Sequence, residues 1–492
     1  MLTILTTTST KDKVEAIINS VDQLSELVSV TLSATEINPT HKLLYVDETV
    51  KPALEWNDTE PPYLIPEQEF NQVHLLALVF YKLGNHQRAL ELSESTESLH
   101  HHLLIATSLQ YGYAITQEML NFTSEIAHNL AILNHYGNLN FEPKSSIDKH
   151  YSYALENAQN DEEATFTAKH YGAYLLDKSN FKAAENLATE YVKKGISKEA
   201  QNAMAQLLSQ ALMHQLQIPY DSKKLEKTFE LQNACIAFYE ERSLLINAGL
   251  LLMDAAETVG YKGDYPTANT LINKAIHYFK EEQITEFMGE ASLKKATLLY
   301  AWSKNGNHQY YKPAINAFQD SLKIFKKHNA PDKYGEIQHK LALIYSEIPV
   351  SPDEKPIWTA FCASAFKEAL EIYSEEKHPY EFAMVCHNYA TALINFPEAK
   401  LHNNLNKAFD LFENALKIRT AKAYPIERSL SLLNQVELLW QMHNADKDEE
   451  EKHFNLMQQK ANEVLQLTSE QHLIERAQEH LNALNNLKIT LN

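Results

Sequence analysis

Four polar residues in the C-terminal half stand at equivalent places and could recognise a peptide. Lys294, Lys340, Asn388 and Asn434 each come two residues before a small or β-branched apolar residue of a repeated pattern. Two ammonium groups and two amides in one row could bind acidic peptide segments. The alternative is that all four are ordinary solvated residues. In the first interpretation the row is a binding surface and does not catalyse a reaction.

Two other constellations could do chemistry, but their spacing argues against it. Cys386-His387 contains a thiol and an imidazole, which a thiol protease pairs. Adjacent helical residues point about 100° apart, so these two cannot face each other, and Cys386 is predicted to be a packing residue. The run His100-His101-His102 diverges in the same way, whereas paired metal ligands on a helix need i, i+4 spacing. Phosphate loops, zinc-type cysteine pairs and nucleophile elbows are also missing, so we expect no enzyme, cofactor or metal.

A repeat of about 46 residues must position the polar row. Small residues recur at steps of 46, 48, 46 and 46, and a second series runs seven residues ahead of the first. The first series is Ala275, Ser321, Ala369, Ala415 and Ala461, and the second is Ala268, Ala314, Cys362, Ala408 and Phe454. Phe318, Phe366 and Phe412 lie between the two series in three of the units, which therefore carry an i, i+4, i+7 stripe on one helical face. Such a period predicts stacked helix pairs with the phenylalanines in the core.

Three segments can be distinguished along the chain. Residues 1–65 read as an N-terminal cap region, with a helix expected over 11–27, strands at 28–32 and 43–46, and a proline-rich linker over 57–66. Residues 66–220 read as a first helical array with turns at Gly84-Asn85 and Ser179-Asn180, and an antiparallel pair over 99–136. Residues 221–492 read as a second array of longer period. There Pro331, Pro379 and Pro425 begin helices, and a final helix over about 470–487 caps the end.

Composition sets limits on partners. The chain has 492 residues and a formal net charge of −20, which disfavours nucleic acid and anionic membranes as partners. Only 11 glycines and 16 prolines occur, which favours long helices. Three scattered cysteines do not make a disulfide framework, and the first residues do not resemble a secretory signal. We therefore expect a cytoplasmic protein.

The residues of the turns carry a family resemblance. Gly263-Asp264-Tyr265 with Ala268 and Ala275 resembles the tetratricopeptide repeat. The longer units, with His378-Pro379-Tyr380-Glu381 and His387-Asn388-Tyr389-Ala390, are similar to long-period bacterial arrays that accompany CHAT-type proteases and signalling modules. The general resemblance covers about residues 66–492. It implies an all-α, right-handed superhelical solenoid of antiparallel helix pairs.

The resemblance also implies a concave groove lined by the first helix of each pair. It places the polar row in that groove, and His339 and His387 stand just before two of its members. Tyr300 and Trp440 are added as anchoring aromatics. The expected partner-binding residues are Lys294, Tyr300, His339, Lys340, His387, Asn388, Asn434 and Trp440.

The function expected from this arrangement is a non-enzymatic scaffold or adaptor that binds another protein or a peptide. The partner could be an effector encoded by a neighbouring gene, such as a protease. Two alternatives stay open: a peptide-sensing regulator that switches a partner effector, and, with least support, an enzyme within residues 1–65.

Overall fold

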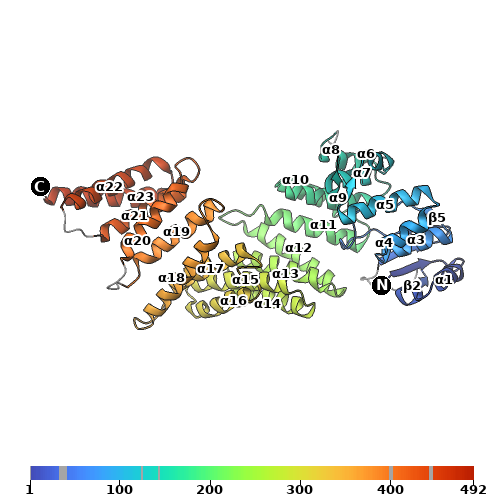
Figure 1. Cartoon of the computed structure of the whole chain (residues 1–492), viewed down its shortest axis with the longest axis horizontal. Helices are drawn as coiled ribbons and strands as arrows, with labels where there is room; N and C mark the ends of the chain where they lie inside the picture. Colours follow the sequence, from blue (N-terminus) through green and yellow to red (C-terminus); the bar gives the residue numbers. More distant parts are fainter. Residues whose placement is uncertain are drawn as a thin grey trace. The chain divides into compact units, whose positions relative to one another are not determined.

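The computed structural model describes residues 2–32, 42–123, 126–141, 145–397, 403–442 and 447–491. The chain divides into two compact units, residues 1–282 and 283–492 (Figure 1). Antiparallel helix pairs build both units, which makes the fold the all-α repeat solenoid expected from the sequence. The segment boundaries expected at residues 65 and 220 stay predictions. In the described residues, no helix combines the length and apolarity needed to cross a bilayer.

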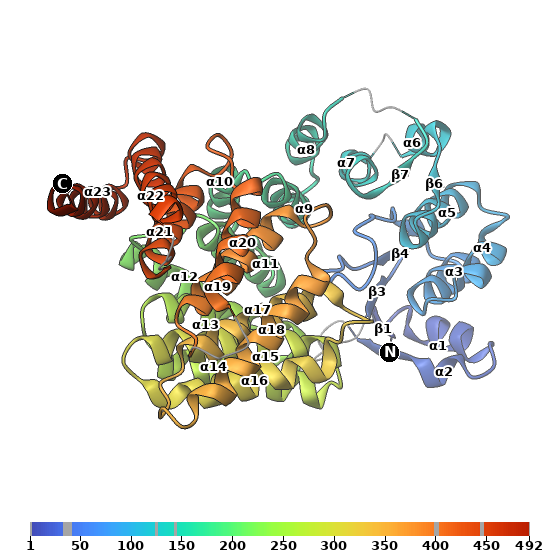
Figure 2. The same cartoon turned by 60° about the vertical axis from the view of Figure 1, so that its left-hand side comes forward.

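The first unit begins with a small α/β region. Its elements are β1 (Leu2–Thr6), α1 (Lys11–Asn19), α2 (Leu24–Leu27), β2 (Val28–Leu32), β3 (Lys42–Val46), β4 (Thr49–Pro52) and β5 (Gln68–Glu69). The strand order is β2-β1-β3-β4-β5, in which β1 pairs in parallel with β2 and β3 while β3, β4 and β5 are antiparallel. Helix α1 lies beside the sheet, and its Val14 and Ile18 share one hydrophobic cluster with Leu2, Ile4 and Leu44 (Figure 2).

The two strands expected in this region are present, and the expected helix is interrupted. The helix that begins at Lys11 ends at Asn19, and Gln23 then adopts a left-handed φ of 59° before α2. Strands β1 and β4 were not expected. Every residue of β1 is buried, so it lacks the alternation of apolar and polar residues that marks a half-buried strand.

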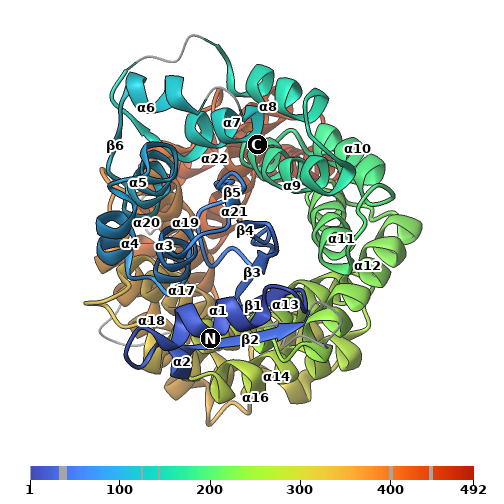
Figure 3. The same ribbon diagram turned by 90° about the vertical axis from the view of Figure 1, so that its right-hand side faces the viewer.

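Helix pairs follow within the first unit. They are α3 (Gln72–Lys82), α4 (His86–Ser93), α5 (Glu97–Tyr111), α6 (Gln117–Phe122), α7 (Ala127–Tyr136), α8 (Ile147–Glu156), α9 (Asp161–Asp177), α10 (Phe181–Tyr191), α11 (Lys198–Met213), α12 (Ser222–Glu241), α13 (Leu245–Tyr261) and α14 (Tyr265–Glu281). The expected turns occur at Gly84, Ser179 and Gly263, each with positive φ. The single pair expected over 99–136 is not found: this stretch forms α5, α6 and α7, α7 packs mainly against α8, and the short strands β6 (Ala114–Ile115) and β7 (Asn138–Leu139) pair with each other. The first helices α9 and α11 run side by side, with α10 and α12 behind them (Figure 3).

The second unit contains four longer pairs and a final helix. Its helices are α15 (Thr285–Lys304), η1 (His308–Tyr310), α16 (Tyr311–Ile324), α17 (Pro331–Glu347), α18 (Lys355–Ile372), α19 (Pro379–Ile394), α20 (Asn404–Ile418), α21 (Pro425–Gln441), α22 (Lys447–Leu467) and α23 (Gln471–Leu491). Helices α17, α19 and α21 begin with proline, as predicted. Proline suits this position because the first amide of a helix has no intrahelical partner.

The predicted seam of small residues and phenylalanines is the core of the second unit. Phe318, Phe366 and Phe412 are fully buried. So are the small residues that flank them on α16, α18 and α20, which are Ala314, Ser321, Cys362, Ala369, Ala408 and Ala415. Because small side chains let the next helix approach, each phenylalanine fills the space left beside them.

A second seam, which the sequence analysis missed, consists of glycines on first helices that face aromatic rings near the ends of second helices. It explains the close approach of the two helices of a pair. A Cβ atom added to Gly289 on α15 would lie 2.7 Å from a ring carbon of Phe325, and one on Gly335 of α17 would lie 3.0 Å from Tyr373. In the first unit, a Cβ atom added to Gly249 on α13 would lie 2.6 Å from a ring carbon of Phe279. The first helix therefore needs a residue without a side chain where the aromatic end of the second helix crosses it.

Candidate functional site

The structure brings the predicted polar row of the second unit together along successive first helices. Lys294 is partly exposed on α15. Lys340 Nζ on α17 donates a hydrogen bond to Thr297 Oγ1 on α15 over 3.3 Å. Asn388 Nδ2 on α19 lies 2.9 Å from His339 Nε2 on α17. Lys340 and Asn388 therefore reach back to the first helix of the preceding pair.

The same pattern continues to the last helix. Asn434 Nδ2 on α21 donates to Thr391 Oγ1 on α19 over 3.2 Å, and its Oδ1 accepts from Arg476 Nη2 on α23 over 3.2 Å. His387 Nδ1 lies 3.0 Å from Ser431 Oγ. These side chains connect neighbouring pairs, so a guest would compete with bonds that already exist.

Burial keeps His339 and His387, the two histidines next to the polar row, uncharged. It lowers the pKa of His339 to about 4, with a smaller contribution from the charge of Lys340. It lowers the pKa of His387 to about 3, where Arg419 adds to the effect. Both imidazoles are therefore neutral near pH 7 and act as hydrogen-bonding groups.

The two predicted anchoring aromatics have polar partners. The Tyr300 hydroxyl donates to Glu347 Oε2 over 2.6 Å, and Lys304 Nζ lies 5.4 Å from the centre of its ring. Burial, followed by the bond to Glu347, raises the Tyr300 pKa. Trp440 Nε1 donates to His480 Nδ1 over 3.2 Å. Their assignment as anchors for a partner stays a prediction.

A hollow lies in the first unit, where the sequence analysis placed no site. Its volume is about 960 Å³, and the first helices α9, α11 and α13 line it together with the Trp56–Asp58 segment. Lys169, Ala173 and Leu176 of α9 follow an i, i+4, i+7 spacing, as do Gln206, Gln210 and Met213 of α11. One stripe of each of these helices therefore faces the hollow.

The lining combines an apolar surface with amides and charges. Leu176, Leu207 and Met213 contribute apolar surface, while Gln206, Gln210 and Asn247 contribute side-chain amides. Tyr220 and Tyr261 stack with their ring centres 4.7 Å apart. The charged members are Asp58, Lys169, Asp177, Asp254 and Glu257. The exposed surface of the lining is somewhat more polar than apolar.

Side chains of the helical array hold the backbone of the linker next to this hollow. The amide of Asn129, fully buried on α7, accepts from the Leu64 backbone N–H and donates to the Leu64 carbonyl, both over 2.7 Å. His128 Nε2 lies 2.7 Å from the Pro62 carbonyl. Lys169 Nζ on α9 donates to the Trp56 carbonyl over 2.8 Å. Backbone groups of the linker are therefore bound by side chains of the array.

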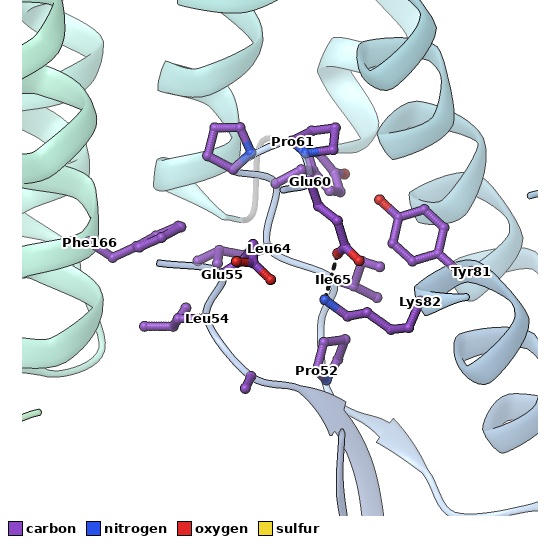
Figure 4. Close-up of a pocket in the computed structure, with 13 residues that line it drawn as sticks. Pro52, Leu54, Glu55, Glu60, Pro61, Leu64, Ile65, Tyr81, Lys82 and Phe166 are labelled. Carbon is purple, nitrogen blue, oxygen red and sulfur yellow. Dashed lines mark hydrogen bonds and ion pairs between the residues drawn. The ribbon is translucent and has the colours of Figure 1, made fainter. Parts of the chain in front are cut away.

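A buried ion pair secures the other side of the linker. Glu60 Oε2 lies 2.7 Å from Lys82 Nζ on α3 (Figure 4). Glu60 Oε1 lies 2.7 Å from Lys42 Nζ on β3. Tyr81 and Pro61 stand beside the pair in a cavity of about 40 Å³. This cavity is too small for a ligand, and the three charges tie the sheet, the linker and α3 to one another.

Comparison with known proteins finds only distant structural similarity. No protein family and no curated protein matches the sequence. Among solved structures, the apo form of the quorum sensor NprR from B. thuringiensis is 14% identical, with a TM-score of 0.43, covering 70% of this chain and 92% of its own. A Rap protein complexed with competence and sporulation factor is also 14% identical, with a TM-score of 0.41, covering 82% and 99%. The resemblance of the repeats to the tetratricopeptide repeat stays a prediction from the sequence. The association with CHAT-type proteases stays a prediction.

The residues considered for catalysis and metal binding occupy packing and hydrogen-bonding positions. Burial raises the thiol pKa of Cys386 to about 12, so it is a protonated packing residue. His100, His101 and His102 point to different partners: the Leu90 carbonyl, the Glu97 carbonyl and the Tyr63 hydroxyl. Within the described parts of the chain, acidic, histidine and cysteine residues form no group suited to a metal ion.

The Asn129→Ala variant tests how the linker is held. It removes both partners of the Leu64 backbone groups, and a buried polar group without a partner costs about 1–3 kcal/mol. We expect the free energy of unfolding to fall by about 2–3 kcal/mol, and limited proteolysis to cut faster within residues 53–66. Asn157→Ala is the matched control, because that amide bonds only to the Tyr153 carbonyl of its own helix. Equal effects of the two variants would show that Asn129 does not hold the linker.

Proposed function

We propose that this protein is a non-enzymatic scaffold that binds an extended peptide, or an extended segment of another protein, in the hollow of its first unit. The observation that carries the proposal is the lining by three successive first helices, α9, α11 and α13, around about 960 Å³. This volume is at the upper end of the range for small-molecule sites, which is about 300–1,000 Å³, and suits several residues of an extended chain.

The linker supports this proposal because it is an internal example of the same interaction. Asn129 on α7 binds both backbone groups of Leu64, and Lys169 on α9 binds the Trp56 carbonyl. Bonds to the main chain give affinity that does not depend on sequence. Gln206 and Gln210 on α11 and Asn247 on α13 offer the same kind of groups to a guest on the helices that follow.

The polar row of the second unit is a second proposed contact, for acidic segments. Lys294 is partly exposed, and Lys340 lies 2.8 Å from Glu336 Oε1 as well as bonding Thr297. A guest carboxylate would have to displace Glu336 from this ammonium group. We therefore expect the row to contribute less affinity than the hollow.

A regulator is the second candidate function, and one feature of the hollow favours it. Trp56 and Asp58 of the linker line the hollow, and Lys169 holds Asp58 Oδ1 at 2.7 Å. A guest would therefore touch the segment that joins the α/β region to the array. Binding that differs between two linker positions would shift their populations and transmit occupancy to a partner effector.

Selection from a linear peptide display library on the full chain tests the binding function. Ala203→Trp on α11 fills the hollow with an indole ring, and we expect it to weaken binding of the selected peptides at least about tenfold in fluorescence anisotropy. Ala205→Trp is the matched control, because Ala205 is on the same helix with similar exposure but does not line the hollow. Lys294→Ala with Lys340→Ala tests the row in the same assay. Equal affinity of the two tryptophan variants, or no enriched peptide, would refute the proposed site.

A further inference from the structure

We infer that α18 of the second unit is a dimerisation surface, on which α18 of a second copy of this chain packs antiparallel about a two-fold axis. The outer face of α18 carries Ile357 and Phe361, whose side chains are 55% and 47% exposed. Ala360 lies between them and is exposed as well. A cluster of exposed apolar side chains, unlike scattered single ones, marks an interaction surface.

The neighbouring helix pairs show that the fold does not require apolar residues at these three places. By the steps of the repeat, the equivalent residues lie 48 positions earlier, around α16, and 46 positions later, around α20. They are Gln309, Lys312 and Pro313 in the earlier pair, and Asn403, Asn406 and Lys407 in the later pair. The inward face, by contrast, carries small residues and a phenylalanine in all three pairs. The apolar outer face is therefore specific to α18, and the stacking of the array does not explain it.

Aromatic rings of the same unit hold this apolar surface in place. The ring centre of Phe361 lies 5.9 Å from that of Trp358 and 5.7 Å from that of Tyr345 on α17. Trp358 and Tyr345 are also 5.7 Å apart, and both pack against the core of the second unit. Because these contacts restrict Phe361 before any partner binds, association costs little additional side-chain entropy.

The outer face of α18 has the spacing of a helix–helix seam. Five exposed residues follow one another along it at alternating steps of four and three, and they are Asp353, Ile357, Ala360, Ser364 and Lys367. This spacing keeps all five on one side of a helix. Asp353 lies in the turn before α18, where the Lys355 N–H donates to the Ser351 carbonyl four residues earlier, so the helical path already includes this turn.

The charges at the two ends of the seam complement those of a second copy. Asp353 is seven residues before Ala360, and Lys367 is seven residues after it. A two-fold axis through Ala360 therefore places Asp353 of each copy opposite Lys367 of the other, about 10 Å from the axis on either side. Within the described ranges, neither side chain takes part in an ion pair. A parallel arrangement would bring like charges together, so the charges favour the antiparallel one.

The size of the surface indicates a reversible dimer. Ala360 on the axis lets the two helices approach, and Ile357 and Phe361 fill the space beside it. Interfaces of standard size bury about 1,200–2,000 Å², and one helix face from each copy is smaller, so we expect a dissociation constant of about 10–100 µM. A dimer carries two copies of the hollow, so it would hold a partner with two binding segments more tightly than a monomer does.

Sedimentation velocity of the full chain from about 1 to 300 µM tests the surface. We expect the unsubstituted protein to change from monomer to dimer over this range. Ile357→Glu with Phe361→Glu should raise the dissociation constant at least about tenfold. Tyr380→Glu with Ile426→Glu is the matched control, because both residues are 44% exposed and lie on α19 and α21, and it should leave the constant unchanged. Circular dichroism shows whether each variant is folded.

Exchange of the two charges tests the partner and its orientation. Asp353→Lys alone and Lys367→Asp alone should each raise the dissociation constant at least about fivefold at low salt, because each creates two like-charge contacts. Both changes in one chain restore the pairs with reversed sign, so this variant should return to within about twofold of the original constant. Asp410→Lys, at an exposed position of α20, controls for the change of net charge.

Three results would overturn the inference. They are a chain that stays monomeric up to about 300 µM, a dimer that Ile357→Glu with Phe361→Glu does not weaken, and a charge-exchanged variant as weak as the single ones. These measurements need no peptide, so their outcome does not depend on the proposed binding function.

Discussion

Replacing Phe366 by alanine should lower the free energy of unfolding by about 3–5 kcal/mol. The Phe366 side chain on α18 is fully buried, and its ring stacks on Tyr389 of the next pair with ring centres 4.8 Å apart. Cys362 and Ala369 flank it on the same helical face and are also fully buried. Neither small neighbour can fill the space, so the variant leaves a cavity between two helix pairs as well as losing buried apolar surface.

Urea denaturation followed by circular dichroism measures this effect. Phe361→Ala is the matched control, because Phe361 is on the same helix but is 47% exposed. We expect its effect to stay near or below about 1 kcal/mol. A loss below about 1 kcal/mol for Phe366→Ala would mean that the stripe of phenylalanines does not form the core between the pairs.

Acidification from pH 7 to pH 5 should destabilise the second unit by about 2 kcal/mol for each of His339 and His387. Burial lowers their pKa values to about 4 and about 3, below the ordinary value of 6.5. Between pH 6.5 and about 4 the unfolded chain therefore binds protons that the folded chain does not. Stability consequently falls as the pH is lowered through this window, and it is recovered above pH 6.5.

Urea denaturation at several pH values checks this prediction. His387→Gln keeps a hydrogen-bonding side chain beside Ser431 but removes the titrating group, so the loss between pH 7 and pH 5 should shrink by about 2 kcal/mol. His328→Gln removes an imidazole from an exposed position and controls for the substitution itself. If the free energy of unfolding of His387→Gln fell between pH 7 and pH 5 as much as that of the unsubstituted protein, the role assigned to the burial of His387 would be contradicted.

The core of the second unit could be predicted from the sequence because its period is nearly constant. Phe318, Phe366 and Phe412 recur at steps of 48 and 46, so a single helical face could be recognised in three units. The glycine seam was missed because its partners lie on the other helix of the pair. Nothing local in the sequence shows that Gly289 must face Phe325, 36 residues later.

The hollow could not be predicted because its helices do not share that period. Helices α9, α11 and α13 begin at residues 161, 198 and 245, so the steps between them are 37 and 47 residues. The polar stripes of α9, α11 and α13 therefore do not stand at equivalent numbers. The spacing of Gln206, Gln210 and Met213 could have revealed one stripe, but which helical face turns toward its neighbours depends on tertiary packing.

The hydrogen bonds made by the polar row could not be predicted either. The spacing identified Lys340, Asn388 and Asn434 as equivalent, and the structure places them along one line of first helices. It also shows that they bond to the preceding helix, which a repeat pattern alone does not reveal. Their contact with a partner stays a prediction.

The bonds between Asn129 and Leu64 have a consequence for dissecting the protein. An expression fragment that starts at residue 66 would keep α7 and α9 but discard the backbone that satisfies Asn129 and His128. Those two side chains would then be uncovered on a surface adapted to an extended strand, and such a fragment should self-associate or capture unrelated polypeptides. Truncated versions intended for crystallisation or for pull-down assays should therefore retain the N-terminal residues, or supply residues 53–66 as a separate peptide.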